Sequence, residues 1–190
     1  MTIITQGSLV TYTQHTLADR PDLQAGVDSL AQYWDEFMLH SPVSYQHFGR
    51  LYETFPQFQS VLCDGDRVIA RMLSIPIRWD GADDSLPDTG WEWAVVNGVE
   101  THDKGETPTA VSAMEISIHP DYRGKGISKL AVQGMKDNAI RLGFDKLFVP
   151  VRPSLKSSYP LTPATNYAAW TKDESDAPFD PWLRVHWRLG

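Results

Sequence analysis

The sequence predicts an α/β fold of the α+β type, built on a mixed sheet with a parallel βαβ unit at its centre. An alternating apolar run at residues 114–118 precedes a glycine-bearing turn and a helical stripe from Ile127. A second apolar run, residues 145–151, follows the first after about thirty residues, a spacing that predicts parallel neighbouring strands. Asp64-Gly65, between two β-branched runs, predicts an antiparallel hairpin in the same sheet.

Length and composition indicate one soluble globular domain. The chain has 190 residues, of which 42% are hydrophobic and 11% aromatic, and its net charge is −7. The negative charge argues against nucleic acid or an anionic membrane as a partner. No apolar run approaches the ~18 residues of a membrane span. The single cysteine, Cys63, has no partner for an internal disulfide, which predicts a reducing, cytoplasmic location.

The N-terminal half predicts a strand and two helices. Residues 9–13 are β-branched and aromatic, which is typical of a strand. Pro21-Asp22 begins the first helix, and Ser44 is the expected N-cap of the second, which Pro56 ends. The helical stripes are expected in the core or on a partly exposed substrate wall. They comprise Leu23, Val27, Leu30, Trp34, Phe37 and Met38, and then Tyr45, Phe48, Leu51, Tyr52 and Phe55.

The hairpin strands are expected at residues 58–63 and 67–77, with Pro76 at a bulge or an edge position. Residues 80–110 are a glycine- and proline-rich insertion, long for a connection, in which a short helix begins near Thr89 and carries Trp91, Val95 and Val99 on one side. We expect this insertion to be either a lid over a binding site or a surface excursion. After the βαβ unit, a short helix is expected at about residues 164–170. Residues 182–189 alternate apolar and basic side chains, which predicts a final half-buried strand.

The turn between the first parallel strand and the helix has the features of an anion site. Arg123-Gly-Lys-Gly126 supplies flexible backbone and positive charge directly before a helix N-terminus, whose first N–H groups are unpaired. The spacing does not fit a P-loop, and the dinucleotide fingerprint G-x-G-x-x-G fails at Lys129. The alternative is an ordinary βα turn with two capping glycines. The segment Arg123 to Ser128 resembles the R-x-x-G-x-G/A loop of the GNAT family of acetyl-CoA-dependent N-acetyltransferases, with serine at the last position.

This resemblance implies a single GNAT-like domain over residues 1–190, with helices on both faces of a twisted sheet. The specific match covers about residues 113–151. Domains of that family usually finish with two strands, and only one is expected here. Either the chain lacks the last strand, or a second subunit, as in a homodimer, covers the edge of its C-terminal strand.

The resemblance also implies acetyl-CoA, or another acyl-CoA, as co-substrate, and we expect no metal because the six histidines lack metal-ligand spacing. The backbone of Ile116 and Ile118, on either side of Ser117, is expected to pair with the pantetheine arm. Lys156 is expected to reach a CoA phosphate. The pyrophosphate is expected on Arg123, Gly124, Lys125, Gly126, Ile127 and Ser128.

Direct transfer of the acyl group to an amine needs a base, a donor that polarises the thioester and an acid. Strand alternation places Glu115 on the face opposite Met114, Ile116 and Ile118. Glu115 is therefore the expected base, with a structural carboxylate paired with an arginine as the alternative. His119, at the strand end, is a second candidate base.

For the acid, the resemblance implies Tyr159 or Tyr167. Cys63 lies in no nucleophile signature, so direct attack is expected instead of a covalent acyl-enzyme. The predicted function is acetyl transfer from CoA to a primary amine of a small molecule or peptide. The alternative is a non-catalytic module that binds acyl-CoA or a partner and keeps the fold. Acidic loops at residues 80–88 and 173–176 either attract a cationic amine or are solvated surface.

Overall fold

The structure is a computed structural model, and it describes residues 2–4, 11–33, 40–173 and 175–190. The chain folds as two compact units, residues 1–150 and residues 151–190, which are described in turn. The expectation of a single domain over the whole chain stays a prediction.

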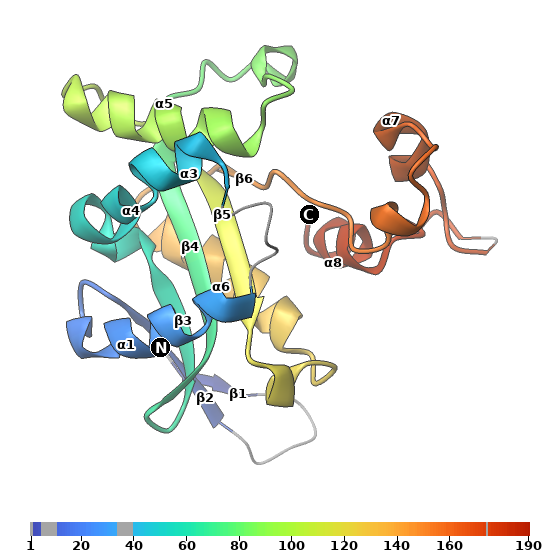
Figure 1. Ribbon diagram of the computed structural model, residues 1–190. Coiled ribbons are helices and arrows are strands. Elements are labelled where there is room, and N and C mark those ends of the chain that lie inside the picture. The colour runs from blue at the N-terminus through green and yellow to red at the C-terminus, as the bar shows by residue number, and fades with distance from the viewer. Residues whose placement is uncertain (1, 5–10, 34–39, 174) are drawn as a thin grey trace. The chain divides into compact units, whose positions relative to one another are not determined.

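The first unit contains a six-stranded mixed sheet whose strands lie in chain order (Figure 1). Neighbouring strands are antiparallel from β1 to β5, and β5 and β6 are parallel. The strands are β1 (Thr2–Ile4), β2 (Thr11–Thr16), β3 (Ser60–Asp64), β4 (Arg67–Ile77), β5 (Ala110–Ile118) and β6 (Leu147–Phe148). The predicted mixed sheet, hairpin and parallel unit are confirmed. Leu9 and Val10 of the expected first strand lie outside the described residues.

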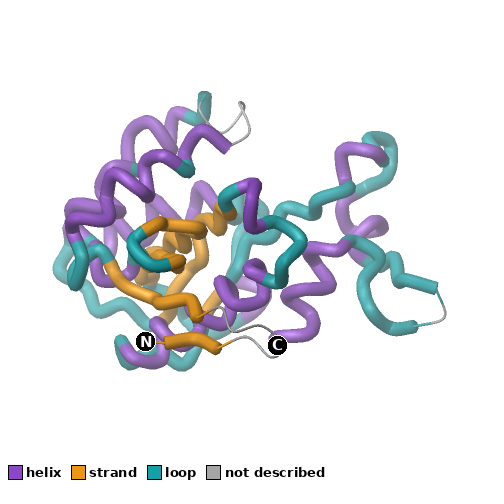
Figure 2. The backbone as a smooth tube through the Cα atoms, turned by 90° about the horizontal axis from the view of Figure 1, so that it is seen from below, coloured by secondary structure: helices purple, strands orange, loops and turns teal. Residues whose placement is uncertain are grey.

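Helices cover both faces of the sheet, as predicted (Figures 1 and 2). Side chains of α1, α4 and α5 pack with Leu73 and Ile75 of β4, and those of α6 pack with Met72 on the other face. The longer helices are α1 (Gln24–Ser29), α3 (Pro42–His47), α4 (Gly49–Thr54), α5 (Trp91–Asp103) and α6 (Ile127–Arg141). Across the described ranges, no helix is both long and apolar enough to cross a membrane.

The N-terminal helices differ from the prediction in two places. Ser41, not Ser44, caps α3, because the Ser41 hydroxyl accepts a hydrogen bond from the Ser44 N–H. Pro42 is thus the first helical residue instead of an interruption. Tyr45, expected in the core or on a partly exposed substrate wall, is 93% exposed. The expected stripe residues Trp34, Phe37 and Met38 lie outside the described residues.

The insertion at residues 80–110 is more regular than expected, because it holds the 13-residue helix α5. Val95 and Val99 are buried on one side of this helix, as predicted. Gly98 lies so close to β4 that an added Cβ would stand 2.5 Å from Ile75. Helix α5 therefore belongs to the core of the first unit, and its interpretation as a lid stays a prediction.

The second unit contains the expected short helix, α7 (Ala164–Ala168), but its last element is a helix, α8 (Pro181–Leu189). The predicted C-terminal strand is wrong because Asp180 and Pro181 begin a helix. The Asp180 carboxylate accepts hydrogen bonds from the two backbone N–H groups that follow the proline. The described part of this unit has no C-terminal strand edge, so the expected homodimer through such an edge loses its basis.

Four aromatic rings pack together in the second unit. Their centroids lie 4.9–6.2 Å apart, and they belong to Tyr159, Tyr167, Trp170 and Phe179. The buried Tyr167 hydroxyl donates to Asp180 Oδ2 at 2.9 Å, and the Leu155 N–H donates to the same oxygen at 2.8 Å. One carboxylate thereby joins the aromatic cluster to the cap of α8.

Candidate active site

Strand β5 is open along its C-terminal half. Strand β6 pairs with it at only two positions, Val111 with Leu147 and Ser112 with Phe148. Among the described residues of the first unit, no strand pairs with residues 113–118 on that side. The two strands are parallel neighbours, as predicted, and they separate beyond Ser112.

The backbone of the open segment directs hydrogen-bonding groups into this gap. The His119 N–H donates to the Ile69 carbonyl of β4 at 2.8 Å, so residue 119 faces β4. Alternation along the strand then directs the N–H groups of Ile116 and Ile118 away from β4, toward the open edge. Both residues are only partly buried. A strand edge of this kind can pair with an extended chain that contains amides.

The open edge leads to the N-terminus of α6 through a glycine turn. Gly124 and Gly126 have φ angles of 73° and 77°, and an added Cβ at either would meet nothing within 4 Å. Gly126 is the N-cap and gives the first helical N–H groups no side-chain hydrogen bond. These N–H groups and the helix dipole suit an anion. The Ile127 side chain is 1% exposed and anchors the start of the helix in the core.

Two exposed cations lie beside the glycine turn. The Arg123 guanidinium is 5.5 Å from the centroid of the Tyr33 ring, and the Lys125 ammonium is 5.2 Å from that of Tyr122. Arg123 Nε also donates to the Ile118 carbonyl at 3.2 Å. These contacts hold positive charge next to the unpaired N–H groups of α6.

A bulge interrupts β5 at the point where β6 departs. The pairing of β4 with β5 shifts register between Leu73 and Ser74, so Met114 has no partner opposite it. Because of the bulge, Met114 packs with the cluster on the α5 side, whereas Ile116 and Ile118 pack with the cluster on the α6 side. The expectation that these three side chains share one face is wrong at Met114.

The carbonyl of the bulge residue is bound by a side chain from the inserted helix. The Trp91 indole N–H donates to the Met114 carbonyl at 2.9 Å. Trp91 is the first residue of α5, and its ring stacks on that of Phe48 at 6.2 Å with an interplanar angle of 22°. Sequence reasoning assigned Trp91 to the face of a short helix and did not anticipate this contact.

Glu115 is held in a buried ion pair. Arg71 Nε and Nη2 donate to its two carboxylate oxygens at 2.7 and 2.8 Å, and the two side chains are 2% and 7% exposed. The Ser117 hydroxyl also donates to Glu115, and Arg71 Nη1 donates to the Val27 carbonyl at 3.1 Å. Because a guanidinium donates to both oxygens, neither is open to direct contact with an amine. This geometry matches the structural alternative, and a role as base stays a prediction.

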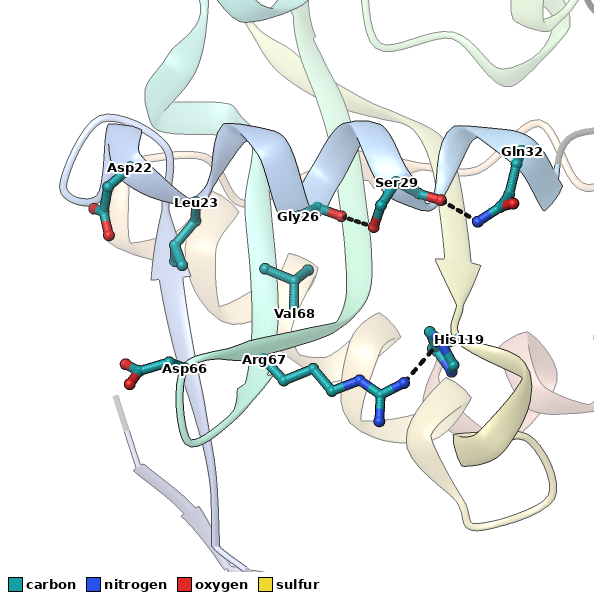
Figure 3. Close-up of a pocket in the computed structure, with 9 residues that line it drawn as sticks. All are labelled: Asp22, Leu23, Gly26, Ser29, Gln32, Asp66, Arg67, Val68 and His119. Atoms are coloured by element: carbon teal, nitrogen blue, oxygen red, sulfur yellow. Dashed lines mark hydrogen bonds between the residues drawn. The ribbon is translucent and has the colours of Figure 1, made fainter.

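A cavity of about 450 Å³ lies between α1 and the start of β4 (Figure 3). Asp22 and Asp66 line one end, and Arg67 and His119 the other. His119 Nε2 lies 3.0 Å from Arg67 Nη2, so this ring is already engaged. Since His119 is five positions beyond the bulge at Met114, about 16 Å along a strand, the cavity is not at the bulge.

The remaining predicted site residues lie in the second unit. Lys156 Nζ donates to the Tyr159 carbonyl at 3.0 Å. Burial, together with the hydrogen bond to Asp180, raises the pKa of Tyr167 to about 12. Tyr159 is half-buried and has a more accessible ring than Tyr167. Of the two tyrosines, Tyr159 is the better placed to exchange a proton.

Among the predicted site residues, those of the β5 edge and the loop Arg123–Ser128 come together on one continuous path. Arg71 and Trp91 were missed. An arginine within an otherwise apolar strand is a signal of a buried ion pair, whereas nothing in the sequence indicated the contact of Trp91. Within the described part of the chain, no group of three or more His, Cys, Asp or Glu residues can hold a metal ion.

An open strand edge that leads to a glycine-lined helix N-terminus can bind a ligand that carries amides along an extended arm and a phosphate at its end. The chain belongs to the acetyltransferase (GNAT) family, whose model matches residues 29–162. The arginine N-acetyltransferase avaD of Aspergillus versicolor is 29% identical over 198 residues, which cover 94% of this chain and 68% of that protein.

Two solved structures share the fold. The loading GNATL domain of CurA from Lyngbya majuscula has a TM-score of 0.72 at 19% identity, over 94% of this chain and 83% of that one. The GphF GNAT-like decarboxylase, in complex with isobutyryl-CoA, has a TM-score of 0.64 at 15% identity, over 94% and 84%. The family and the curated relative confirm the predicted GNAT membership and an acyl-CoA-dependent N-acetyltransferase activity.

Proposed function

We propose that the acyl donor is acetyl-CoA, bound along the open edge of β5. The observation that carries this proposal is the continuity of that edge with the helix N-terminus at Gly126. The pantetheine arm has two amides, which would pair with the backbone of Ile116 and Ile118. The pyrophosphate would accept hydrogen bonds from the N–H groups of the loop and of Ser128, next to Arg123.

We further propose that the acceptor is a cationic primary amine of the arginine type. Two observations support this class. The curated relative is named an arginine N-acetyltransferase, and the chain carries a net charge of −7, which favours the approach of small cations. The transfer itself requires a neutral amine nitrogen, so the substrate must lose one proton before or during attack.

The proposed chemistry is direct attack. The amine nitrogen forms a bond to the thioester carbonyl carbon, the C–S bond breaks, the amine loses a proton and the thiolate gains one. Arg71 donates to both Glu115 oxygens, so Glu115 can receive the amine's proton only through a water molecule, and solvent is the alternative acceptor. Tyr159 acts as acid in preference to Tyr167, whose pKa of about 12 lies too far above the ~8.5 of a thiol.

The cofactor proposal is tested by isothermal titration with acetyl-CoA, free CoA and ATP. The wild-type chain should bind both CoA species and not ATP. Gly126→Glu should abolish binding, because it places bulk and negative charge at the pyrophosphate. Gly105→Glu is the matched control, since Gly105 also has a positive φ, 65°, and open space around it, but lies in the turn after α5. Equal loss of binding in both variants would contradict the placement.

The acceptor proposal is tested with a panel of amines at saturating acetyl-CoA. Arginine and agmatine, which share the guanidinium, should release free thiol faster than citrulline, which lacks the charge. Mass spectrometry should find the acetylated amine. Tight CoA binding without acylation of any amine would favour the non-catalytic binding module instead.

We also infer a cytoplasmic location. Cys63, the single cysteine of the sequence, is a free and buried thiol, and a chain without a disulfide suits a reducing compartment.

A further inference from the structure

Strands β5 and β6 separate beyond Ser112, and on the proposed function the acyl group reaches this point. From the loop at Gly126, an extended pantetheine that pairs with Ile118 and then Ile116 runs toward the bulge at Met114. Strand β6 closes the gap immediately beyond, where it pairs with Ser112. The reactive thioester must therefore lie beside Met114.

A bulge at this position creates an electrostatic difficulty. A bulged residue is left out of the regular ladder, so its carbonyl needs another donor. Next to a thioester, a bare carbonyl oxygen would repel the negative charge that develops on the acyl oxygen during attack. In this chain the Met114 carbonyl is not bare, because the Trp91 indole N–H donates to it at 2.9 Å.

The position of Trp91 is fixed by the packing of its helix. Gly98 lets α5 approach β4 closely, and Val95 and Val99 are buried beneath it. The Phe48 ring stacks on Trp91 and limits its rotation. The indole is therefore preorganised, and it need not be ordered when substrate arrives.

We propose that Trp91 is a positioning residue for acyl transfer. Its indole N–H binds the Met114 carbonyl and fixes the β5 bulge, so that backbone N–H groups, and not a carbonyl oxygen, face the thioester. The residue touches neither substrate directly. Its effect reaches the reaction through the geometry of the strand that holds the acyl group.

The test compares Trp91→Phe with Trp93→Phe. The first keeps an aromatic ring against Phe48 and removes the N–H, and the second removes an indole that is also partly buried on the same helix. Trp91→Phe should lower kcat by about tenfold to a hundredfold, with the KM for acetyl-CoA and the Kd for CoA unchanged. Trp93→Phe should leave all three unchanged. A kcat in Trp91→Phe equal to that of the control would overturn the proposal, and so would a parallel loss of CoA affinity.

A spectroscopic measurement reports the contact itself. Met114-Glu115 is the only Met–Glu pair in the sequence. Labelling with carbonyl-¹³C methionine and ¹⁵N glutamate therefore gives a single carbonyl–amide NMR signal for this peptide bond. The Met114 carbonyl signal should move upfield in Trp91→Phe and stay in place in Trp93→Phe. An unmoved signal in Trp91→Phe refutes the inference. A shifted signal in Trp91→Phe, combined with a wild-type chain that acylates no amine, refutes the proposed function while the contact stands.

Discussion

Arg71 of β4 forms a bidentate ion pair with Glu115 of β5, the strand that carries the open edge, and the two side chains are only 2% and 7% exposed. Arg71 also donates to the carbonyl of Val27, in α1. The pair thus links a helix on one face of the sheet to the strand at the site. Because both charges are shielded from water, removing either one would leave the other buried without a counter-ion.

Replacing Glu115 should therefore destabilise the fold before it affects catalysis. Glu115→Gln leaves the Arg71 charge buried without its counter-ion, which should cost about 3–5 kcal/mol in urea denaturation. Glu106→Gln is the control, because it removes one partner of the exposed Arg78–Glu106 pair and should cost under about 1 kcal/mol. A Glu115→Gln chain as stable as wild type, with most of its turnover lost, would instead identify Glu115 as the base.

The amides of Ile116 and Ile118 should respond to the cofactor. In the free chain their N–H groups face the open edge and should exchange with solvent quickly. Acetyl-CoA should slow this exchange by about tenfold or more, the effect of a hydrogen bond worth about 1.4 kcal/mol. Val61, which pairs with His15 on one side and Arg71 on the other, provides the internal control in the same NMR measurement. Unchanged exchange at 116 and 118 in the cofactor-saturated chain would place the pantetheine elsewhere.

Replacing the two candidate tyrosines should have different effects, one on stability and the other on kcat. Tyr167→Phe removes a hydrogen bond to the Asp180 carboxylate and should cost about 1.5–3 kcal/mol of stability. Tyr159→Phe should leave stability nearly unchanged and lower kcat. Thermal melts and initial rates on both variants distinguish these outcomes. A selective loss of kcat in a stable Tyr167→Phe chain would reverse the assignment.

The second unit should lose stability in acid. Burial alone would raise the pKa of Asp180, but hydrogen bonds from the N–H groups of Leu155 and Leu183 and from the Tyr167 hydroxyl hold it below the ordinary 3.8. A depressed folded-state pKa contributes stability that is full above the ordinary value and is lost as pH falls through the folded one. The protection of amides in residues 151–190 against hydrogen exchange, measured relative to the intrinsic rate at each pH, should therefore fall below about pH 4.

Asp180→Asn is the matched test of that pH dependence. The amide cannot ionise, so the variant should be less stable at neutral pH and should lack the additional acid step. An identical acid profile in wild type and Asp180→Asn would assign the transition to other carboxylates.

The sequence anticipated the parts of this molecule that depend on local pattern. The spacing around Gly124 and Gly126 predicted the turn and helix α6 because a positive φ and an N-terminal anion site are local properties. The C-terminal helix was missed because alternating residues were given more weight than the Asp180-Pro181 start signal. Because the last element is a helix and not a strand, the argument for a dimer through a strand edge no longer holds.

The contacts inside the site depend on packing between distant segments. Arg71 meets Glu115 across a distance of 44 residues in sequence, and Trp91 reaches Met114 across 23. The bulge that moves Met114 to the other face has no local marker, so alternation alone assigned its side chain wrongly. Such features follow from the tertiary fold.

The most direct test of the central claim is a turnover assay with acetyl-CoA and arginine. Thiol release would be followed continuously, and the product would be identified by mass spectrometry, with Gly126→Glu and Gly105→Glu run in parallel. We predict stoichiometric release of CoA and formation of an N-acetylated product by wild type and Gly105→Glu, and neither by Gly126→Glu. Acetylation of arginine by Gly126→Glu at the wild-type rate would contradict the placement of the cofactor at this helix N-terminus.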